Sequence, residues 1–216
     1  YTTADLVNAG LALYEKDAAG ANMTMFHFAP RQAPETKNAT EVTIAFSVYN
    51  QEQLFYNSDT GLYEKNDPDG SGTTDADNGQ RVSFKNLLIL YASSGIKDDG
   101  YTRQYDLSGG TGLYITDGGW QEIRWTKGDA AAPLALTTTE GATLEVNPGK
   151  TFLAIYGGFY GQSLTVAASD GTVQTLPERM PLLDSAVSDE AAAAAQAVQD
   201  AENAVLAALA EQADAE

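Results

Sequence analysis

An acidic, glycine-rich segment, residues 66–79, has the residue types and spacing of a calcium-binding loop. Its candidate ligands, which supply oxygen atoms at alternating places of the loop, are Asp67, Asp69, Ser71 and Asp75. Calcium loops also carry a glycine at the sixth place, which is Gly72 here, and a glutamate at the twelfth, which is Asn78 here. Because Asp, Gly and Ser also form ordinary turns, we favour a turn without metal, and the alternative is a weak calcium site.

A second set of residues has the chemistry of a binding surface. Its members, which lie on adjoining predicted strands, are Tyr101, Arg103, Trp120, Arg124, Trp125 and Lys127. Aromatic rings and cations together could line a groove for a glycan or a peptide. The alternative, which we favour, is that the aromatic residues form ordinary sheet core and cross-strand pairs.

Catalytic residues are harder to find. His27 is the only histidine and the chain has no cysteine, which leaves no Ser-His-Asp or Cys-His set and no ordinary zinc site. Paired carboxylates remain an option, because Asp98, Asp99, Asp106 and Glu122 lie on neighbouring predicted strands and turns. Two facing carboxylates hydrolyse glycosidic bonds. We therefore expect a protein that is not an enzyme, with a cell-wall glycan hydrolase as the alternative.

Charge and hydropathy limit the possible partners. Twelve basic and 30 acidic residues give a net charge of -18, which repels the phosphate groups of nucleic acids, so we expect no nucleic-acid partner. The longest apolar run, Leu87 to Ala92, suits a buried strand and is far shorter than the roughly 20 residues of a membrane helix. Without cysteine the chain has no disulfide, and 216 residues are enough for a core that needs none.

The elements that carry these residues are mostly short strands. Residues 3–16 have apolar positions at helical spacing after Thr2 and Thr3, whereas from Glu41 the apolar residues alternate, as in strands. Tight turns rich in Asp and Gly separate the strands that follow. The sequence therefore predicts a mainly β (α+β overall) protein. In it an antiparallel meander forms a sandwich or a partly open barrel.

We divide the chain into three parts. Residues 1–38 are expected to be the end of an upstream N-terminal domain, a helix followed by a strand, and residues 39–178 the antiparallel β domain. Residues 179–216 are expected to be a linker and an acidic, Ala-rich helical tail that begins at Ser188.

Several short sequence pieces, taken in their order and spacing, resemble the C-terminal domain of YerB-like bacterial lipoproteins, a domain of unknown function. These pieces are Ala45-Phe46-Ser47, Tyr63-Glu64-Lys65, Thr74-Asp75, Lys85-Asn86-Leu87-Leu88-Ile89, Asp98-Asp99-Gly100, Asp117-Gly118, Trp125-Thr126-Lys127, Gly141 and Asn147-Pro148-Gly149-Lys150-Thr151-Phe152. The resemblance covers Val42 to Tyr156. Residues 66–72 look inserted relative to the family pattern, and the tail from Ser188 lies outside it.

The resemblance implies an extracytoplasmic protein held to the outer face of the cell membrane by a lipidated cysteine upstream of Tyr1. The family has no catalytic residues to transfer to this sequence. We therefore expect a non-enzymatic binding or scaffolding domain of a bacterial lipoprotein, with an envelope protein or a cell-wall glycan as partner. Its only expected contact with the membrane is the upstream lipid anchor. Besides the glycan hydrolase, a calcium-stabilised adhesion or interaction domain is an alternative.

Overall fold

The computed structural model describes residues 3–14, 24–29, 34, 36, 38–97, 99–128, 132–159 and 161–183. The predicted Ala-rich tail lies outside the described residues. Among the described residues no helix has the length and apolar character needed to cross a membrane.

The described part of the chain is mainly β, with one short helix, α1 (Ala4–Leu13). The strands are β1 (His27–Phe28), β2 (Glu41–Ser47), β3 (Asn50–Asn57), β4 (Leu62–Asn66), β5 (Ser83–Phe84), β6 (Asn86–Tyr91), β7 (Ser94–Ile96), β8 (Arg103–Tyr105), β9 (Gly109–Thr116), β10 (Gly119–Thr126), β11 (Ala135–Thr138), β12 (Glu145–Val146), β13 (Thr151–Tyr156) and β14 (Ser163–Ala167). This order confirms the predicted mainly β class.

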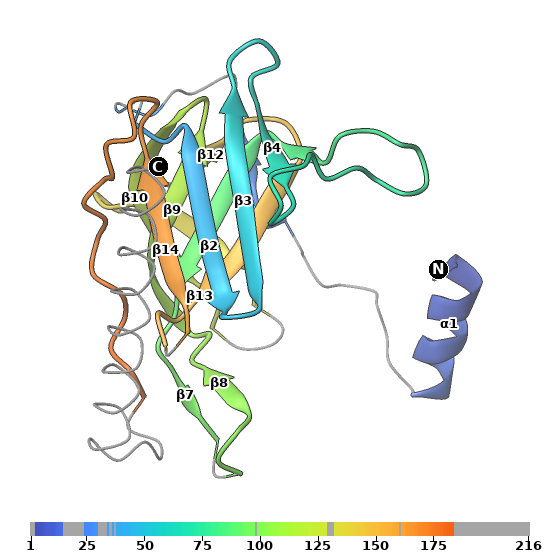
Figure 1. Ribbon diagram of the computed structural model, residues 1–216. Helices are drawn as coiled ribbons and strands as arrows, with labels where there is room; N and C mark the ends of the chain where they lie inside the picture. Colours follow the sequence, from blue (N-terminus) through green and yellow to red (C-terminus); the bar gives the residue numbers. More distant parts are fainter. Residues whose placement is uncertain are drawn as a thin grey trace.

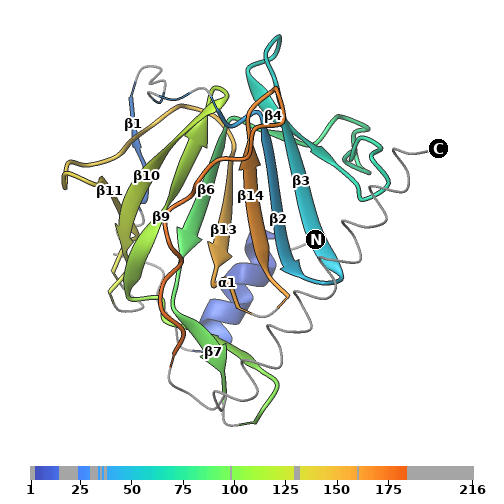
Figure 2. The ribbon, with the colours of Figure 1, turned by 60° about the vertical axis from the view of Figure 1, so that its left-hand side comes forward.

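Two five-stranded sheets pack face to face and form an open sandwich (Figure 1). The first sheet has the order β14-β2-β3-β4-β5 and the second the order β11-β10-β9-β6-β13. Figure 2 shows the edge strands β13 and β14, which belong to different sheets, between β6 and β2. Two-stranded pairs, β7 with β8 and β1 with β12, complete the described strands. A sandwich was one of the two predicted architectures, and the described strands form no closed barrel.

The core between the sheets follows from the alternation of side chains along each strand. On β2, Val42 and Ile44 are fully buried and meet the inner face of the second sheet. On β6 every residue is buried, because Leu87 and Ile89 face the first sheet whereas Leu88 belongs to a second cluster on the opposite face. A strand that is covered on both faces is apolar throughout, which explains the apolar run from Leu87 to Ala92.

The second cluster packs the outer face of β6, β9 and β10 against β11 and the segment that leads into β12. Its buried members are Leu88, Leu90, Ala92, Tyr114, Ile123, Trp125, Leu134, Leu136, Leu144 and Val146. The second sheet therefore has apolar layers on both faces, and the β domain has two cores.

One pairing differs from the predicted antiparallel meander. Strands β6, β9, β10 and β11 are neighbours joined antiparallel, but β13 joins the free edge of β6 in parallel. The register places Thr151 beside Asn86 and Tyr156 beside Tyr91. Because β6 and β13 are far apart in the sequence and both are short apolar runs, their pairing left no local signal.

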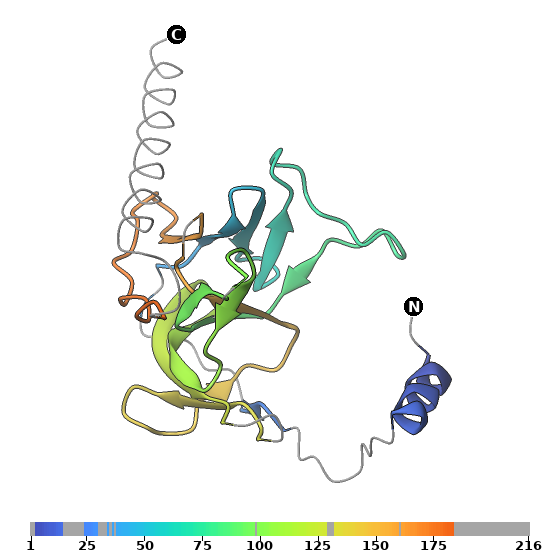
Figure 3. The same cartoon turned by 90° about the horizontal axis from the view of Figure 1, so that it is seen from below.

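The predicted N-terminal helix is confirmed as α1. Thr3 caps it, because its Oγ1 accepts a hydrogen bond from the Leu6 N–H at 3.3 Å. None of its residues is buried, and the helix lies apart from the two sheets (Figures 1 and 3). The predicted strand at residues 23–29 is shorter in the structure, where β1 covers His27–Phe28 and pairs in parallel with β12.

Candidate functional site

A network of buried polar side chains lies where the turn between β9 and β10 meets the chain just before β6 and just after β12. At its centre is Asp117, whose side chain is fully buried (0% exposed) and whose φ is 51°. Its Oδ1 forms an ion pair with Lys85 Nζ, and the same ammonium group donates to the Gly61 carbonyl at 3.2 Å. The Lys85 side chain is only 16% exposed. Burying such a pair is costly unless further hydrogen bonds support it.

Two asparagines supply that support. Asn147 Nδ2 donates to Asp117 Oδ2 at 3.2 Å and to Thr116 Oγ1 at 3.0 Å. The backbone N–H of Asn147 donates to the Tyr114 hydroxyl at 2.8 Å, and this hydroxyl donates to Asn86 Oδ1 at 3.0 Å. Asn86 Nδ2 then donates to the Asn147 carbonyl at 2.8 Å. The network therefore fixes the ends of β6, β9 and β12 relative to one another.

Burial also perturbs the tyrosines around this network. It raises the pKa of Tyr63, whose hydroxyl donates to the Ala39 carbonyl at 2.8 Å, and it raises the pKa of Tyr114. Both phenols therefore stay protonated at neutral pH and act as hydrogen-bonding groups. The sequence pieces Lys85-Asn86, Asp117-Gly118 and Asn147-Pro148-Gly149 gave no chemical signal on their own, because the network exists only once the fold joins them.

The opposite end of the sandwich is aromatic and exposed. We call it the hairpin end, and define it by Val48, Tyr49, Tyr101, Arg103 and Phe159. The pair β7 and β8 projects beyond the sheets at the end where β2 turns into β3 (Figure 1). Tyr101 in the β7–β8 connection is 80% exposed and Tyr49 in the β2–β3 turn is 97% exposed. The Arg103 guanidinium lies over the Phe159 ring at 5.2 Å from its centre.

Gln162 ties the hairpin end together. Its side-chain amide donates to the Tyr105 hydroxyl at 3.0 Å and to the Phe46 carbonyl at 3.4 Å, and its Oε1 accepts from the Phe159 N–H at 3.2 Å. One side chain therefore connects the strand β8, the end of β2 and the loop that carries Phe159. The exposed rings stand on a base that is held by hydrogen bonds.

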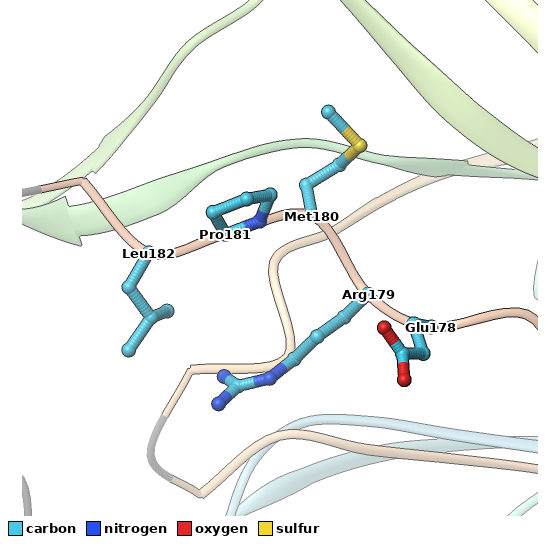
Figure 4. Close-up of a pocket in the computed structure, with 5 residues that line it drawn as sticks. All are labelled: Glu178, Arg179, Met180, Pro181 and Leu182. Atoms are coloured by element: carbon cyan, nitrogen blue, oxygen red, sulfur yellow. The ribbon is translucent and has the colours of Figure 1, made fainter.

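An extended segment, residues 176–183, runs from β14 across the sandwich toward this end. It lines a cavity of about 360 Å³ whose residues are Glu178, Arg179, Met180, Pro181 and Leu182 (Figure 4). Arg179 Nη1 donates to the Gly158 carbonyl, and the Leu183 N–H donates to the Ser94 carbonyl at 2.9 Å. The segment thereby reaches the loop beside Phe159 and the start of β7.

The six predicted binding residues do not form one groove. Tyr101 and Arg103 lie at the hairpin end, whereas Trp120 begins β10 near the buried network and packs partly against the core between the sheets. The interpretation of Trp125 as a binding residue is wrong, because it is 2% exposed and its indole N–H donates to the Tyr91 carbonyl at 3.0 Å. It is a core residue of the second cluster.

The two remaining members of that set are also separate from the hairpin end. Arg124 is exposed on β10, and Lys127 Nζ donates to the Ala132 carbonyl in the loop that follows this strand. Tyr49 and Phe159 were not among the predicted binding residues. Tyr49 is a single aromatic residue in a short polar turn, and the loop of Phe159 has no periodic pattern.

The predicted calcium ligands serve the turns of their own segment. Asp69 Oδ1 accepts from the Ser71 hydroxyl at 2.6 Å and from its N–H at 2.9 Å, which lowers the pKa of Asp69. Asp67 accepts from the Thr73 hydroxyl at 2.8 Å, and Asp75 accepts from the Asp77 N–H at 2.8 Å. The described residues hold no group of three or more His, Cys, Asp or Glu side chains that could bind a metal ion. The calcium site stays a prediction.

The predicted carboxylate pair is likewise divided among turns. Asp99 accepts from the hydroxyl and N–H of Thr102, and Asp106 accepts from the Ser108 N–H at 2.9 Å. These bonds lower the pKa of both aspartates, whereas a general acid of a glycosidase needs a raised pKa. Asp98 lies outside the described residues. His27 is exposed on β1.

Comparison with known proteins agrees with the fold. The model of the family described as "Protein of unknown function (DUF3048) C-terminal domain" matches residues 42–153. The crystal structure of the YerB protein from Bacillus subtilis is similar in fold, with a TM-score of 0.54 and 24% sequence identity. The similarity covers 76% of this chain and 54% of that one, so the chain spans about half the length of YerB. No curated protein matches the chain.

The family match runs from the second residue of β2 to the middle of β13, and therefore includes both asparagines of the buried network, Lys85 and Asp117. It ends before the loop that carries Phe159, so one side of the hairpin end lies beyond it. The chain belongs to the family of proteins of unknown function (DUF3048) and contains its YerB-like C-terminal domain.

Proposed function

We propose that this chain is a non-enzymatic binding or scaffolding domain of an extracytoplasmic bacterial lipoprotein, and that it contacts its partner through the hairpin end. The partner is an envelope protein or a cell-wall glycan. The observation that carries the proposal is the exposure of Tyr49 and Tyr101 at the same end of the sandwich, beside the Arg103–Phe159 pair. Exposed aromatic residues of this kind supply most of the binding energy in many interfaces.

The two arginines at this end support a partner with anionic groups. Although the chain has a net charge of -18, Arg103 and Arg179 both lie beside the loop that carries Phe159. A guanidinium next to exposed rings can bind a carboxylate while the rings stack on a sugar or an apolar side chain. The envelope location follows from the resemblance to YerB-like lipoproteins.

The test is site-specific photo-crosslinking. Replacing Tyr101 with the photo-crosslinking amino acid p-benzoylphenylalanine places a reactive group at the hairpin end. The same replacement at Tyr14 is the matched control, because Tyr14 is 72% exposed at the C-terminal end of α1, away from the hairpin end (Figure 3). Each protein is irradiated with purified peptidoglycan fragments and, separately, with an envelope membrane fraction.

We expect a discrete adduct from position 101 that is absent from position 14, and competition by the unlabelled parent protein. An unlabelled Tyr49→Ala variant should compete several-fold more weakly than the parent, because it lacks one of the two exposed rings. If position 101 gives no adduct beyond the control with either sample, the hairpin end is not the binding surface. The adduct's mass distinguishes a glycan from a protein.

A further inference from the structure

The buried network contains the three groups needed to form an amide bond between two side chains. Such a reaction needs an amine as nucleophile, a carboxamide as acyl donor, and a carboxyl group that touches both and moves protons between them. It also needs a site with little water, because a dry site keeps the amine uncharged and reactive and protects the reaction intermediate from hydrolysis. Lys85, Asn147 and Asp117 are these three groups, and we propose that Lys85 and Asn147 form an intramolecular isopeptide bond with the help of Asp117.

The geometry places one carboxyl group between the amine and the amide. Asp117 Oδ1 contacts Lys85 Nζ, and Asp117 Oδ2 accepts from Asn147 Nδ2 at 3.2 Å. Each oxygen of the same carboxylate therefore holds one of the two reacting groups. The side chain of Asp117 is fully buried and Asn147 is 1% exposed. One buried carboxylate therefore holds the amine and the amide beside each other, which an intramolecular reaction between them requires.

The backbone holds both partners in fixed places. The Lys85 N–H donates to the Lys150 carbonyl at 2.8 Å, which joins the residue before β6 to the residue before β13. Asn147 is held by the Tyr114 hydroxyl and by Asn86, as described above. At Gly149, a Cβ atom would lie 2.5 Å from Lys85 Cβ. A glycine at this position therefore lets the lysine side chain pass toward Asp117.

The chemical step needs no cofactor or oxidant. A proton moves from the Lys85 ammonium group to the Asp117 carboxylate, and the neutral amine attacks the side-chain carbonyl carbon of Asn147. The bond between Nζ and Cγ forms, Asp117 protonates Nδ2, and the bond between Cγ and Nδ2 breaks. Nζ, now bonded to Cγ, gives up a second proton through Asp117, and ammonia leaves with this proton as ammonium, so Asp117 ends as a carboxylate. Atoms and charge balance.

The bond would join the start of β6 to the end of β12 covalently. The two strands belong to the layers on either side of the second cluster, and β13 pairs with β6 directly after this point. A cross-link there would close a loop of the chain from residue 85 to residue 147, which restricts the unfolded state as a disulfide does. Because the chain has no cysteine, the isopeptide bond would supply the covalent cross-link that a disulfide supplies in other proteins.

The experiment is the intact mass of the purified full chain under denaturing conditions. We expect a mass below that of the sequence by one ammonia molecule, about 17 Da. Protease digestion should release a branched peptide that joins Lys85 to Asn147. Lys85→Arg, Asp117→Ala and Asn147→Ser should each restore the full mass, whereas Lys150→Arg, at an exposed neighbouring lysine, should keep the loss.

The parent's mass alone decides the proposal, so a variant that fails to fold does not obscure the result. The full sequence mass for the folded parent, shown to be folded by its circular dichroism, would overturn it. A loss of water in place of ammonia, with a branched peptide that joins Lys85 to Asp117, would also overturn it. That result would make Asp117 the acyl donor.

Discussion

The Tyr114 hydroxyl connects the two asparagines of the buried network, and Tyr114→Phe removes this connection while keeping the aromatic ring. The ring packs in the second cluster, so its burial is retained. The variant leaves the Asn147 N–H without the acceptor at 2.8 Å and Asn86 Oδ1 without the donor at 3.0 Å. Both groups are buried, and water cannot readily replace the hydroxyl.

The expected cost follows from these two bonds. Losing a hydrogen bond costs about 1 kcal/mol net, and leaving a buried polar group unsatisfied costs about 1–3 kcal/mol. We therefore expect Tyr114→Phe to lower the free energy of unfolding by about 2–4 kcal/mol. Tyr49→Phe removes the same hydroxyl from a side chain that is 97% exposed, and should change the free energy by less than about 0.5 kcal/mol.

The assay is equilibrium unfolding in urea, monitored by tryptophan fluorescence and circular dichroism. The midpoint should fall for Tyr114→Phe while the slope of the free energy against urea stays constant, because the exposed surface is unchanged. A loss below about 0.5 kcal/mol, equal to that of the Tyr49 control, would refute the view that the hydroxyl supports the network. It would mean that the asparagines find other partners at no cost.

Three further predictions concern other parts of the β domain. Gly110→Ala should destabilise the protein by about 1–3 kcal/mol, because the added Cβ would lie 2.1 Å from the Tyr91 carbonyl oxygen. The control, Gly10→Ala on exposed α1, should be neutral or slightly stabilising. Equal unfolding midpoints for the two variants would contradict this. Trp125→Ala should cost about 3–5 kcal/mol in urea unfolding, because the indole is core; a change near zero would indicate an exposed binding residue. Asp99 has a lowered pKa in the folded state. Its contribution to the stability of the fold is therefore present at pH values above the ordinary pKa of about 3.9, and is lost as pH falls through the pKa of the folded state. The difference in melting temperature between the parent and Asp99→Asn should therefore shrink as pH falls below the ordinary value of about 3.9, and a difference that is constant with pH would contradict this.

The sequence predicted the elements better than their pairing. Alternating apolar residues identified β2 and the hairpins, and turns rich in Asp and Gly separated the strands of the meander. The parallel pairing of β13 with β6 was not predicted, because a strand buried on both faces carries no alternation that would assign its neighbours. The tail was predicted to be helical from composition alone, and it lies outside the described residues.

The six candidate binding residues lie in separate places, for a related reason. Residue types on a strand do not reveal which face is covered, and Trp125 faces a second apolar layer that the sequence did not indicate. Tyr101 is exposed, because it lies in the β7–β8 connection beyond the two sheets. The buried network could not be predicted, since Lys85, Asp117 and Asn147 become neighbours only when β6 pairs with β9 and β12 packs against these strands.

The two ends of the sandwich can therefore be altered independently. The buried network joins three strand ends through fully buried groups, so changes there should lower stability and leave the exposed rings of the hairpin end in place. Tyr49 and Tyr101 make few contacts within the chain, so their removal should weaken binding and leave the unfolding midpoint unchanged. A Tyr114→Phe protein that stays folded below its melting temperature should compete for the position-101 crosslink as well as the parent does. If it competes poorly, the hairpin end depends on the network for its shape, and the two ends form one functional unit.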